Sequence, residues 1–241
     1  TSILQSVSYP TSPENSVTSG LMSLLVVLAI KNRLKDQNSV SCDVSFPSTD
    51  LLLQGRVGPV TLKGRGWQSE RGLTCRAIEA TVEECQLDAT KILQNRKLFL
   101  TTPARGKAMV ALTAQDFSNF IVHPLMKPPV PTIEFVQEGT KIDPRSGSIF
   151  FYIEHQRQRR KCRLQRSSRE GKRARVRVKD EEETETLSEA LENFFNDMVF
   201  ELDGTMLRFR DLKVADKAGQ PTVMLSLNIE VRKFPSSGVD F

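Results

Sequence analysis

The sequence predicts an α+β protein in which a long antiparallel sheet curls around an apolar N-terminal helix. Two observations lead to this fold class. Apolar side chains recur at helical spacing over residues 16–36. Through most of the later chain they alternate with polar side chains, as in strands that bury one face. The chain has 241 residues, which is long enough to bury a sizeable core in one domain.

The N-terminal part is expected to contain a lead-in and a buried helix. Residues 1–15 are rich in Ser, Thr and Pro, which is typical of a flexible segment. The helix expected over 16–36 is apolar around almost its whole circumference, so it has to be buried on most sides. Its apolar stretch is about half the length of a membrane-spanning helix. We expect four of its side chains to line an apolar interior: Leu21, Leu24, Leu25 and Leu28.

The period of the pattern then changes from 3.6 to 2. A strand is expected over 40–46, with Val40, Cys42, Val44 and Phe46 on its apolar face. Further strands are expected over 51–53, 57–62, 72–82, 97–101 and 107–112, with a short helix over 87–94. The turns or bulges between and within them are marked by Gly55, Gly58, Gly64 and Gly66.

A second helix is expected to begin at Thr113. Thr113 is followed three residues later by Asp116, a pair that resembles a capping box with Asp in place of Glu. Pro124 is expected to end or kink this helix, since proline cannot continue the hydrogen-bond ladder. Its apolar face consists of Phe117, Phe120 and Ile121, which are also candidates for lining the interior.

The last third of the chain combines strands with one amphipathic helix. Strands are expected over 132–136 and 148–155, and the helix over 187–198. Two strands, over 206–214 and 223–234, close the chain. In the last strand every second side chain is apolar and faces one way, so we expect it to line the interior with Leu225, Leu227 and Ile229.

The positive net charge of +5 comes from one segment. Residues 157–179 hold 12 of the 34 Lys and Arg residues but only one of the 29 Asp and Glu residues, so the rest of the chain is net negative. We interpret this segment as part of a charged insertion over about 155–185, with a strand of one cationic face over 173–178. The candidates for docking a headgroup or a partner are Arg157, Arg159, Arg160, Lys161, Arg163, Lys172, Arg173, Arg175 and Arg177.

Catalytic and metal-binding motifs are absent from the sequence. It has no G-x-S-x-G, H-E-x-x-H, P-loop or G-x-G-x-x-G motif. Its two histidines, His123 and His155, have no visible base–nucleophile partner. The four cysteines have no C-x-x-C spacing, so we expect free thiols in a reducing compartment, with a Cys75–Cys85 bridge left open. The sequence thus predicts a protein that is not an enzyme and has no metal or cofactor.

Three stretches together resemble the LmeA-like phospholipid-binding family, a former domain of unknown function of actinobacteria, cyanobacteria and plant plastids. They are the helix with the strand after it, over 16–46; the stretch 72–93; and the stretch 112–125. The closing pair of strands is similar to the family's hairpin, so the resemblance spans about residues 16–233. It implies a sheet curled around a long helix, as in tubular lipid-binding proteins, with acyl chains in the interior and no catalysis. The charged stretch 155–185 departs from the family's pattern.

The sequence therefore leads to three hypotheses about function. The first is binding or transfer of a phospholipid or glycolipid at an anionic membrane surface, by a soluble or peripheral protein of the chloroplast. That setting fits the Ser-rich start, the free thiols and the basic segment. The second is an assembly subunit of a membrane-associated protein complex that docks through the basic segment. The third, nucleic-acid binding, is the least favoured, because residues 157–179 contain no Phe, Tyr or Trp for base stacking.

Overall fold

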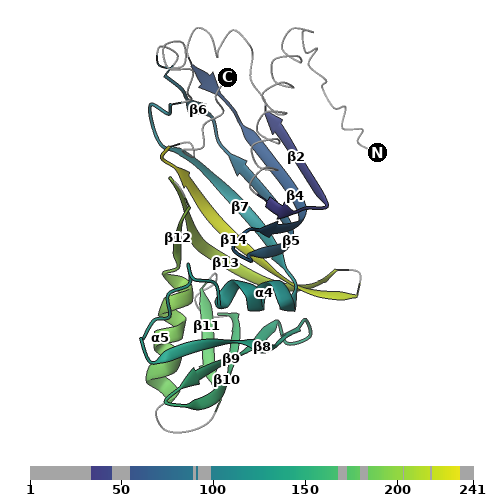
Figure 1. Cartoon of the computed structure of the whole chain (residues 1–241), viewed down its shortest axis with the longest axis vertical. Helices are drawn as coiled ribbons and strands as arrows, with labels where there is room; N and C mark the ends of the chain where they lie inside the picture. The colour runs from purple at the N-terminus through teal and green to yellow at the C-terminus, as the bar shows by residue number, and fades with distance from the viewer. Residues whose placement is uncertain are drawn as a thin grey trace, which may run out of the picture.

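The computed structural model describes residues 34–44, 55–88, 91, 99–167, 173–179, 184–202, 204–217 and 219–233. Within these residues the protein consists of antiparallel sheets and two helices, so the α+β class is confirmed (Figure 1). Several predictions lie outside the described residues. These are the helix up to residue 33 with Leu21, Leu24, Leu25 and Leu28; the strand at 51–53; nearly all of the helix at 87–94; and the candidate residues Phe46 and Lys172.

The largest sheet has eight strands and curls like half of a barrel (Figure 1). Neighbouring strands pair antiparallel throughout. In spatial order its main path is β1 (Leu34–Asp36), β4 (Val60–Ser69), β5 (Thr74–Val82), β7 (Ala104–Leu112), β14 (Gln220–Val231), β13 (Thr205–Lys217) and β12 (Val199–Leu202), while β2 (Ser39–Val44) also pairs with β4. A small two-stranded sheet joins β3 (Arg56–Val57) to β6 (Cys85–Gln86).

A second sheet of four antiparallel strands lies at the other end of the described structure (Figure 1). Its spatial order is β11 (Ala174–Val178), β10 (Gln158–Arg166), β9 (Ser148–His155) and β8 (Ile133–Asp143). Helix α5 (Thr184–Asn196) covers the free edge of β11 with three side chains. The backbone N–H groups of residues 174, 176 and 178 donate to Asn196, Glu192 and Ser188 respectively. This protects an edge that would otherwise offer unpaired donors to another chain.

Helix α4 (Ala114–Ile121) lies between the two sheets (Figure 1). The predicted capping box is confirmed: Asp116 N–H donates to Thr113 Oγ1 at 3.2 Å, and Thr113 N–H donates to Asp116 Oδ2 at 2.9 Å. The helix ends at Ile121, before Pro124, as the proline predicts. Phe117 is completely enclosed, with its ring centroid 6.3 Å from that of Phe151 on β9. The main core therefore joins both sheets and both helices around α4.

The structure corrects one interpretation of the sequence and places the basic segment within the fold. Residues 34–36 form strand β1 on β4 and are not the last turn of a helix, because the edge of β4 supplies hydrogen-bond partners for their backbone. The basic segment forms part of the fold, and the strand predicted over 173–178 is observed as β11. Its strands β10 and β11 pair along five residues, and Cys162, Leu164 and Val176 from these strands are buried in the main core. The cations alternate with these apolar positions, so burial of one face determines where they lie.

Candidate functional site

An apolar cavity of about 280 Å³ lies against one face of the eight-stranded sheet. Strands β4, β5, β7, β14, β13 and β12 form one wall, and the segment from Phe120 to Met126 contributes the opposite side. Most of the lining side chains are hydrocarbon. The lining residues are Leu34, Trp67, Ser69, Leu73, Thr74, Cys75, Ile78, Val110, Leu112, Phe120, His123, Leu125, Met126, Phe200, Leu207, Leu225 and Leu227.

The strand register explains why this wall is continuous. Ile78 on β5 lies opposite Val110 on β7, which lies opposite Leu225 on β14. Residues that are directly opposite in neighbouring strands project to the same face of a sheet, so these three side chains form one apolar row across the curl. The row begins on β4 at Gly64, which pairs with Ile78 and has no side chain of its own.

The place next to Gly64 is taken by the indole of Trp67. A Cβ atom on Gly64 would lie 2.0 Å from an indole carbon of Trp67, so this ring occupies the space that a side chain would need. Strict alternation would place residues 64 and 67 on opposite faces. The positive φ of Gly66, +60°, interrupts the alternation and allows the indole to turn inward. Its Nε1 donates to the carbonyl of Ser39 on β2 at 3.0 Å.

His123 is the one ionisable imidazole of the cavity wall. The residue is 4% exposed. Its Nδ1 accepts a hydrogen bond from the Leu125 N–H at 3.2 Å. Burial lowers the pKa of His123 below its ordinary value, so the ring is neutral at pH 7. A hydrogen bond to the backbone of Arg71 raises that pKa, and the charge of the Arg71 guanidinium lowers it.

The four cysteines of the chain are free, so the question of a Cys75–Cys85 bridge is answered: the bridge is not formed. Cys75 lies in the cavity wall, and burial raises its pKa to about 11. Burial also raises the pKa of Cys162, in the core under β10, to about 12. Neither thiol has the lowered pKa of a nucleophile. Within the described residues there is also no group of three or more His, Cys, Asp and Glu that could hold a metal ion.

Only some of the predicted lining residues lie in the wall of the cavity. Phe120, Leu225 and Leu227 line the cavity. Phe117 and Ile121 lie instead in the core between the sheets. The other described candidates lie farther along the large sheet: Val40 and Cys42 are on β2, Val44 packs with Val57 and Leu87, and Ile229 packs with Ala108 and Leu227.

The sequence interpretation missed several wall residues. Alternation within the predicted strands 72–82 and 107–112 was the signal for Ile78 and Val110, which share a face with their neighbours at every second position. Trp67 and His123 carried no such signal. The first depends on a backbone turn at Gly66, and the second follows the end of α4, where no periodicity applies.

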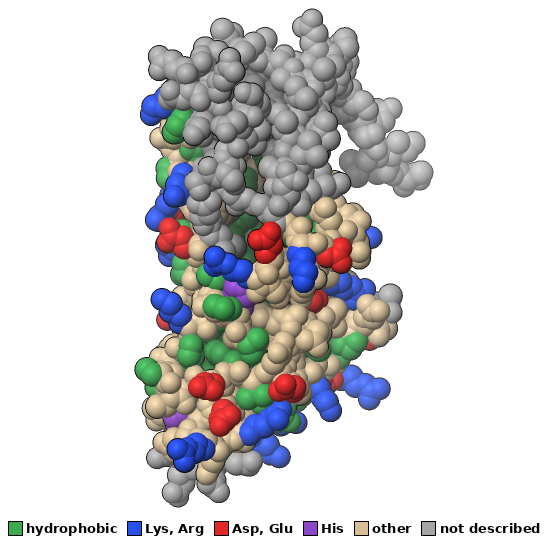
Figure 2. Space-filling model, viewed as in Figure 1, with side chains coloured by type: hydrophobic (Ala, Val, Ile, Leu, Met, Phe, Trp, Pro, Cys, Tyr) green, Lys and Arg blue, Asp and Glu red, His purple; other side chains and the backbone are tan. Residues whose placement is uncertain are grey.

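The cationic residues predicted for docking are concentrated on the outward face of the four-stranded sheet. Arg163 lies between Arg177 on β11 and Phe150 on β9, and Lys161 lies opposite Tyr152. Lys161 Nζ is 4.7 Å from the Phe150 ring centroid, and Arg159 Cζ is 4.5 Å from that of Tyr152. We call this the basic face, and it consists of Arg159, Lys161, Arg163, Arg175, Arg177, Phe150 and Tyr152. Figure 2 shows Lys and Arg side chains, with some acidic ones, around this end of the molecule.

The remaining docking candidates are placed differently. Arg157 is in the β9–β10 turn with a positive φ of 64°. Arg160 is half-buried on β10, and Arg173 precedes β11. The basic face itself is partly neutralised, because Arg175 Nε lies 3.9 Å from Glu192 Oε1 of α5.

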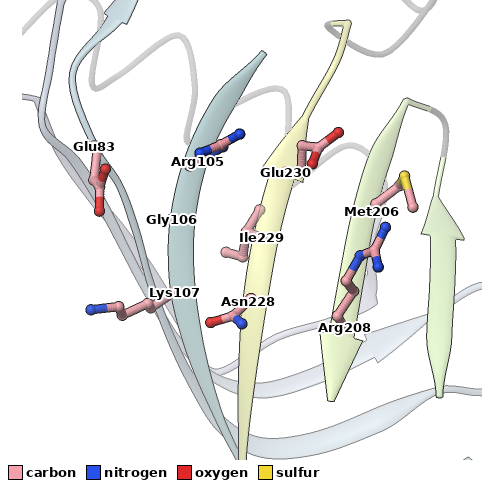
Figure 3. A pocket seen from close by; sticks show the side chains of 9 residues that line it. All are labelled: Glu83, Arg105, Gly106, Lys107, Met206, Arg208, Asn228, Ile229 and Glu230. Carbon is pink, nitrogen blue, oxygen red and sulfur yellow. The ribbon is translucent and has the colours of Figure 1, made fainter. Parts of the chain in front are cut away.

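A second hollow, of about 430 Å³, lies on β7, β14 and β13 (Figure 3). Alternation places Arg105, Lys107, Arg208 and Glu230 on the face of the sheet opposite to Leu225 and Leu227. The hydrogen bond from Arg232, and then the charges of Arg232, Arg208 and Arg105, hold the pKa of Glu230 below its ordinary value. The lining holds three cations, Arg105, Lys107 and Arg208, against two carboxylates, Glu83 and Glu230, so the hollow has a small excess of positive charge.

Among the described residues no helix is long and apolar enough to cross a membrane. Comparisons of the chain with models of known protein families, with curated proteins and with solved structures found no match. The resemblance to LmeA-like proteins therefore stays a prediction, and the case for a function rests on the apolar cavity and the basic face.

Proposed function

We propose that this protein binds a lipid without catalysis, holding an acyl chain in the apolar cavity while it is at an anionic membrane surface. The single observation that carries the proposal is the cavity of about 280 Å³, walled by hydrocarbon side chains of a curled sheet. Protein interiors are close-packed, and voids larger than a water molecule are few. A half-open apolar cavity of this size is a favourable place for apolar guests.

The size of the cavity suits part of one acyl chain. Ligand pockets span about 300–1,000 Å³, so this one is at the lower end. A methylene group is about the size of a water molecule, which takes up about 30 Å³, so the cavity accommodates roughly nine methylene groups. Burying them contributes on the order of 7 kcal/mol before the costs of ordering, at about 0.8 kcal/mol each.

The basic face supports the membrane part of the proposal. Each cation near an anionic bilayer contributes about 1 kcal/mol, and the attraction decays within a Debye length. The hydrocarbon contribution therefore dominates retention of the lipid, while the cations determine docking and headgroup preference. Phe150 and Tyr152 lie beneath Lys161 and Arg159, so they do not stand out as anchors that penetrate the bilayer.

The test compares two cavity variants with one control in native mass spectrometry of the purified protein. Leu225→Asp places a charge in the wall and should abolish co-purification of lipid. Ile78→Phe fills the cavity with hydrocarbon and should displace lipid while the protein stays folded. Asn228→Asp, three residues from Leu225 on the same strand but exposed beside Lys107 and Arg208, should retain lipid. A folded Ile78→Phe protein with undiminished lipid would overturn the proposal.

A second candidate function, binding of single-stranded nucleic acid, is favoured by the two rings of the basic face. The basic segment has no aromatic residues, but the strand register places Phe150 and Tyr152 of β9 among its cations. The two rings are two residues apart on one strand, which is about 6.7 Å, or twice the 3.4 Å between stacked nucleotides. Sheet faces that bind single strands combine stacking rings with cations, and here Lys161 and Arg159 would have to move off the rings to admit bases.

Membrane docking and nucleic-acid binding predict different effects of mutations on the basic face. Binding to vesicles of anionic phosphatidylglycerol should fall in Arg163→Gln/Arg177→Gln and be unchanged in Phe150→Leu/Tyr152→Leu. Binding of a labelled oligouridine should fall in both, because stacking contributes about 1–3 kcal/mol per base. Arg56→Gln, an exposed change on β3, is the control. If oligouridine binds at about 200 mM salt and the vesicles do not, the second candidate replaces membrane docking.

A further inference from the structure

The turn between β4 and β5 forms part of the rim of the apolar cavity. Ser69 and Leu73, at its two ends, both line the cavity and are half-buried. Three hydrogen bonds hold the turn in shape: Ser69 N–H donates to the Leu73 carbonyl at 2.8 Å, Gly72 N–H to the Ser69 carbonyl at 3.1 Å, and Leu73 N–H to Ser69 Oγ at 3.0 Å. Between these ends, Glu70 and Arg71 are exposed. The turn therefore places charged side chains within two residues of a hydrocarbon wall.

The Arg71 guanidinium lies near the wall of the cavity. The ring of His123 lines the cavity and makes a hydrogen bond to the backbone of Arg71. The charge of the guanidinium is close enough to this ring to lower its pKa. Within the described part of the chain, no hydrogen bond or ion pair engages the guanidinium itself. The cavity therefore has an unpaired cation at its rim, beside an apolar interior.

An apolar cavity with a cation at its rim favours an amphiphilic ligand. The hydrocarbon part of such a ligand leaves water for the cavity, while its charged group stays at the rim and pairs with the guanidinium. A guanidinium binds carboxylates and phosphates with two parallel hydrogen bonds, a geometry that lysine lacks. Because Arg71 is exposed, water and salt screen the pair. The charge therefore sets a preference, and hydrocarbon burial supplies most of the affinity.

We infer that the cavity binds a single hydrocarbon chain with an anionic group at one end, and that the Arg71 guanidinium pairs with this carboxylate or phosphate. This inference rests on the proposed function and names the ligand class of the same cavity. The basic face lies on the other sheet, so the preference set by Arg71 concerns the bound ligand and is separate from docking to a membrane. A fatty acid and a lipid phosphate both supply the required charge, and the experiment separates them.

The experiment titrates the protein at neutral pH with three ligands that share a ten-carbon chain: decanoate, decyl phosphate and uncharged decanol. This chain matches the roughly nine methylene groups that the cavity accommodates. The fluorescence of Trp67, the only tryptophan of the chain and a residue of the cavity wall, reports occupancy. At low salt, native protein should bind at least one of the anions about fivefold more tightly than decanol, and about 1 M salt should remove most of this preference. A preference for decanoate identifies fatty acids, and a preference for decyl phosphate identifies lipid phosphates.

Variants of the turn separate the charge of Arg71 from the shape of the cavity. Arg71→Gln should bind decanol as native protein does and lose the preference for anions. Arg71→Lys keeps the charge without the planar fork and should retain part of the preference. Glu70→Gln removes the opposite charge from the same turn and should leave the preference unchanged or larger. Arg65→Gln, an exposed change on β4 outside the cavity wall, is the matched control and should keep the preference.

The outcomes distinguish the inference from the proposed function. The inference is overturned if native protein binds decanol as tightly as both anions, if Arg71→Gln keeps the preference, or if Arg65→Gln loses as much of it as Arg71→Gln does. If none of the three ligands binds the native protein, the proposed function itself fails.

Discussion

Two glycines, Gly64 and Gly66, determine where Trp67 lies. The absence of a side chain on Gly64 leaves a site on the sheet, and the positive φ of Gly66 turns the indole into it. Aromatic rings often cover glycines on sheets, where they replace the missing side-chain packing. At the residue scale, the cavity wall at β4 therefore depends on the two glycines as much as on the indole of Trp67.

Gly64→Val should displace the indole of Trp67. The new Cβ would lie 2.0 Å from the ring, so the ring has to move or the sheet has to open. Overpacking of this kind destabilises by about 1–3 kcal/mol. Urea unfolding should show that loss, with a shift in Trp67 emission in the folded state. Lys63→Ala, at the exposed neighbouring position, serves as the control and should change stability by less than about 1 kcal/mol. An unshifted emission spectrum in Gly64→Val would contradict the packing of Trp67 on Gly64.

The titration of His123 should appear in the pH dependence of stability. Burial lowers its pKa in the folded protein below the ordinary 6.5, so between these two values the unfolded chain binds more protons. The contribution of His123 to the free energy of unfolding is therefore complete above pH 6.5. It is lost as the pH falls from 6.5 through the lowered pKa of the folded state, with a slope of at most about 1.4 kcal/mol per pH unit.

The difference between native protein and His123→Phe isolates this contribution. Both proteins share the exposed acids whose pKa values are lowered, Asp143 and Glu230, and these lose their contributions only at more acidic pH. Urea unfolding at a series of pH values from 5 to 8 should show the native protein losing stability relative to His123→Phe as the pH falls below about 6.5. A difference that stays constant over this range would mean that His123 titrates alike in the folded and unfolded chains.

At the scale of elements, α5 and β11 fit together through matched periods. Acceptors on the helix at residues 188, 192 and 196 meet N–H donors on the strand at residues 178, 176 and 174. Four helical residues rise about 6.0 Å, and two strand residues span about 6.7 Å. The spacing of the helix acceptors therefore nearly matches the spacing of the strand donors. The helix thereby closes the sheet edge that carries part of the basic face.

Asn196→Ala should loosen this edge. Asn196 bonds both the N–H and the carbonyl of Ala174, so its removal leaves two backbone groups of β11 without partners. The expected loss of stability is about 1–3 kcal/mol. Hydrogen exchange should accelerate first at the N–H groups of residues 174 and 176, before the rest of the sheet. Glu189→Ala, exposed on the same helix, is the matched control and should leave exchange in β11 unchanged.

Local sequence predicted some elements well and missed others. Strand β9 was predicted over its observed length, 148–155, because its apolar residues are continuous and rich in β-formers. Strand β10 was not predicted. Seven of its nine residues are Arg, Lys or Gln, and only Cys162 and Leu164 show the buried alternation. Its β-structure depends on pairing with β9 and β11 on both sides, which is a tertiary property.

At the scale of the whole molecule, the core and the cavity are assembled from distant parts of the chain. The core around α4 joins strands of both sheets, and Arg166 on β10 also forms an ion pair with Asp211 on β13 at 3.0 Å. The cavity wall extends in sequence from Leu34 to Leu227. An acyl ligand that bridges these elements would therefore stabilise the folded protein as a unit.

Bound ligand should raise the unfolding temperature of the whole molecule. A ligand that binds only the folded state adds about 2.7 kcal/mol when its concentration is 100 times the dissociation constant. Differential scanning calorimetry with increasing palmitic acid should show a single transition that moves to higher temperature. The transition of the cavity-filled Ile78→Phe protein should not move. Equal shifts in both proteins would show that the ligand binds elsewhere.

The sequence alone determined properties that depend on neighbouring residues. These are the alternation that makes most strands half-buried, the capping box at Thr113, and the apolar identity of Phe120, Leu225 and Leu227. Only the tertiary structure decided what these residues meet. It placed His123 in the wall of the apolar cavity, and it set Phe150 and Tyr152 beside the cations of β10. Strand register and sheet curvature depend on contacts between residues far apart in the chain. A local sequence pattern does not determine those contacts.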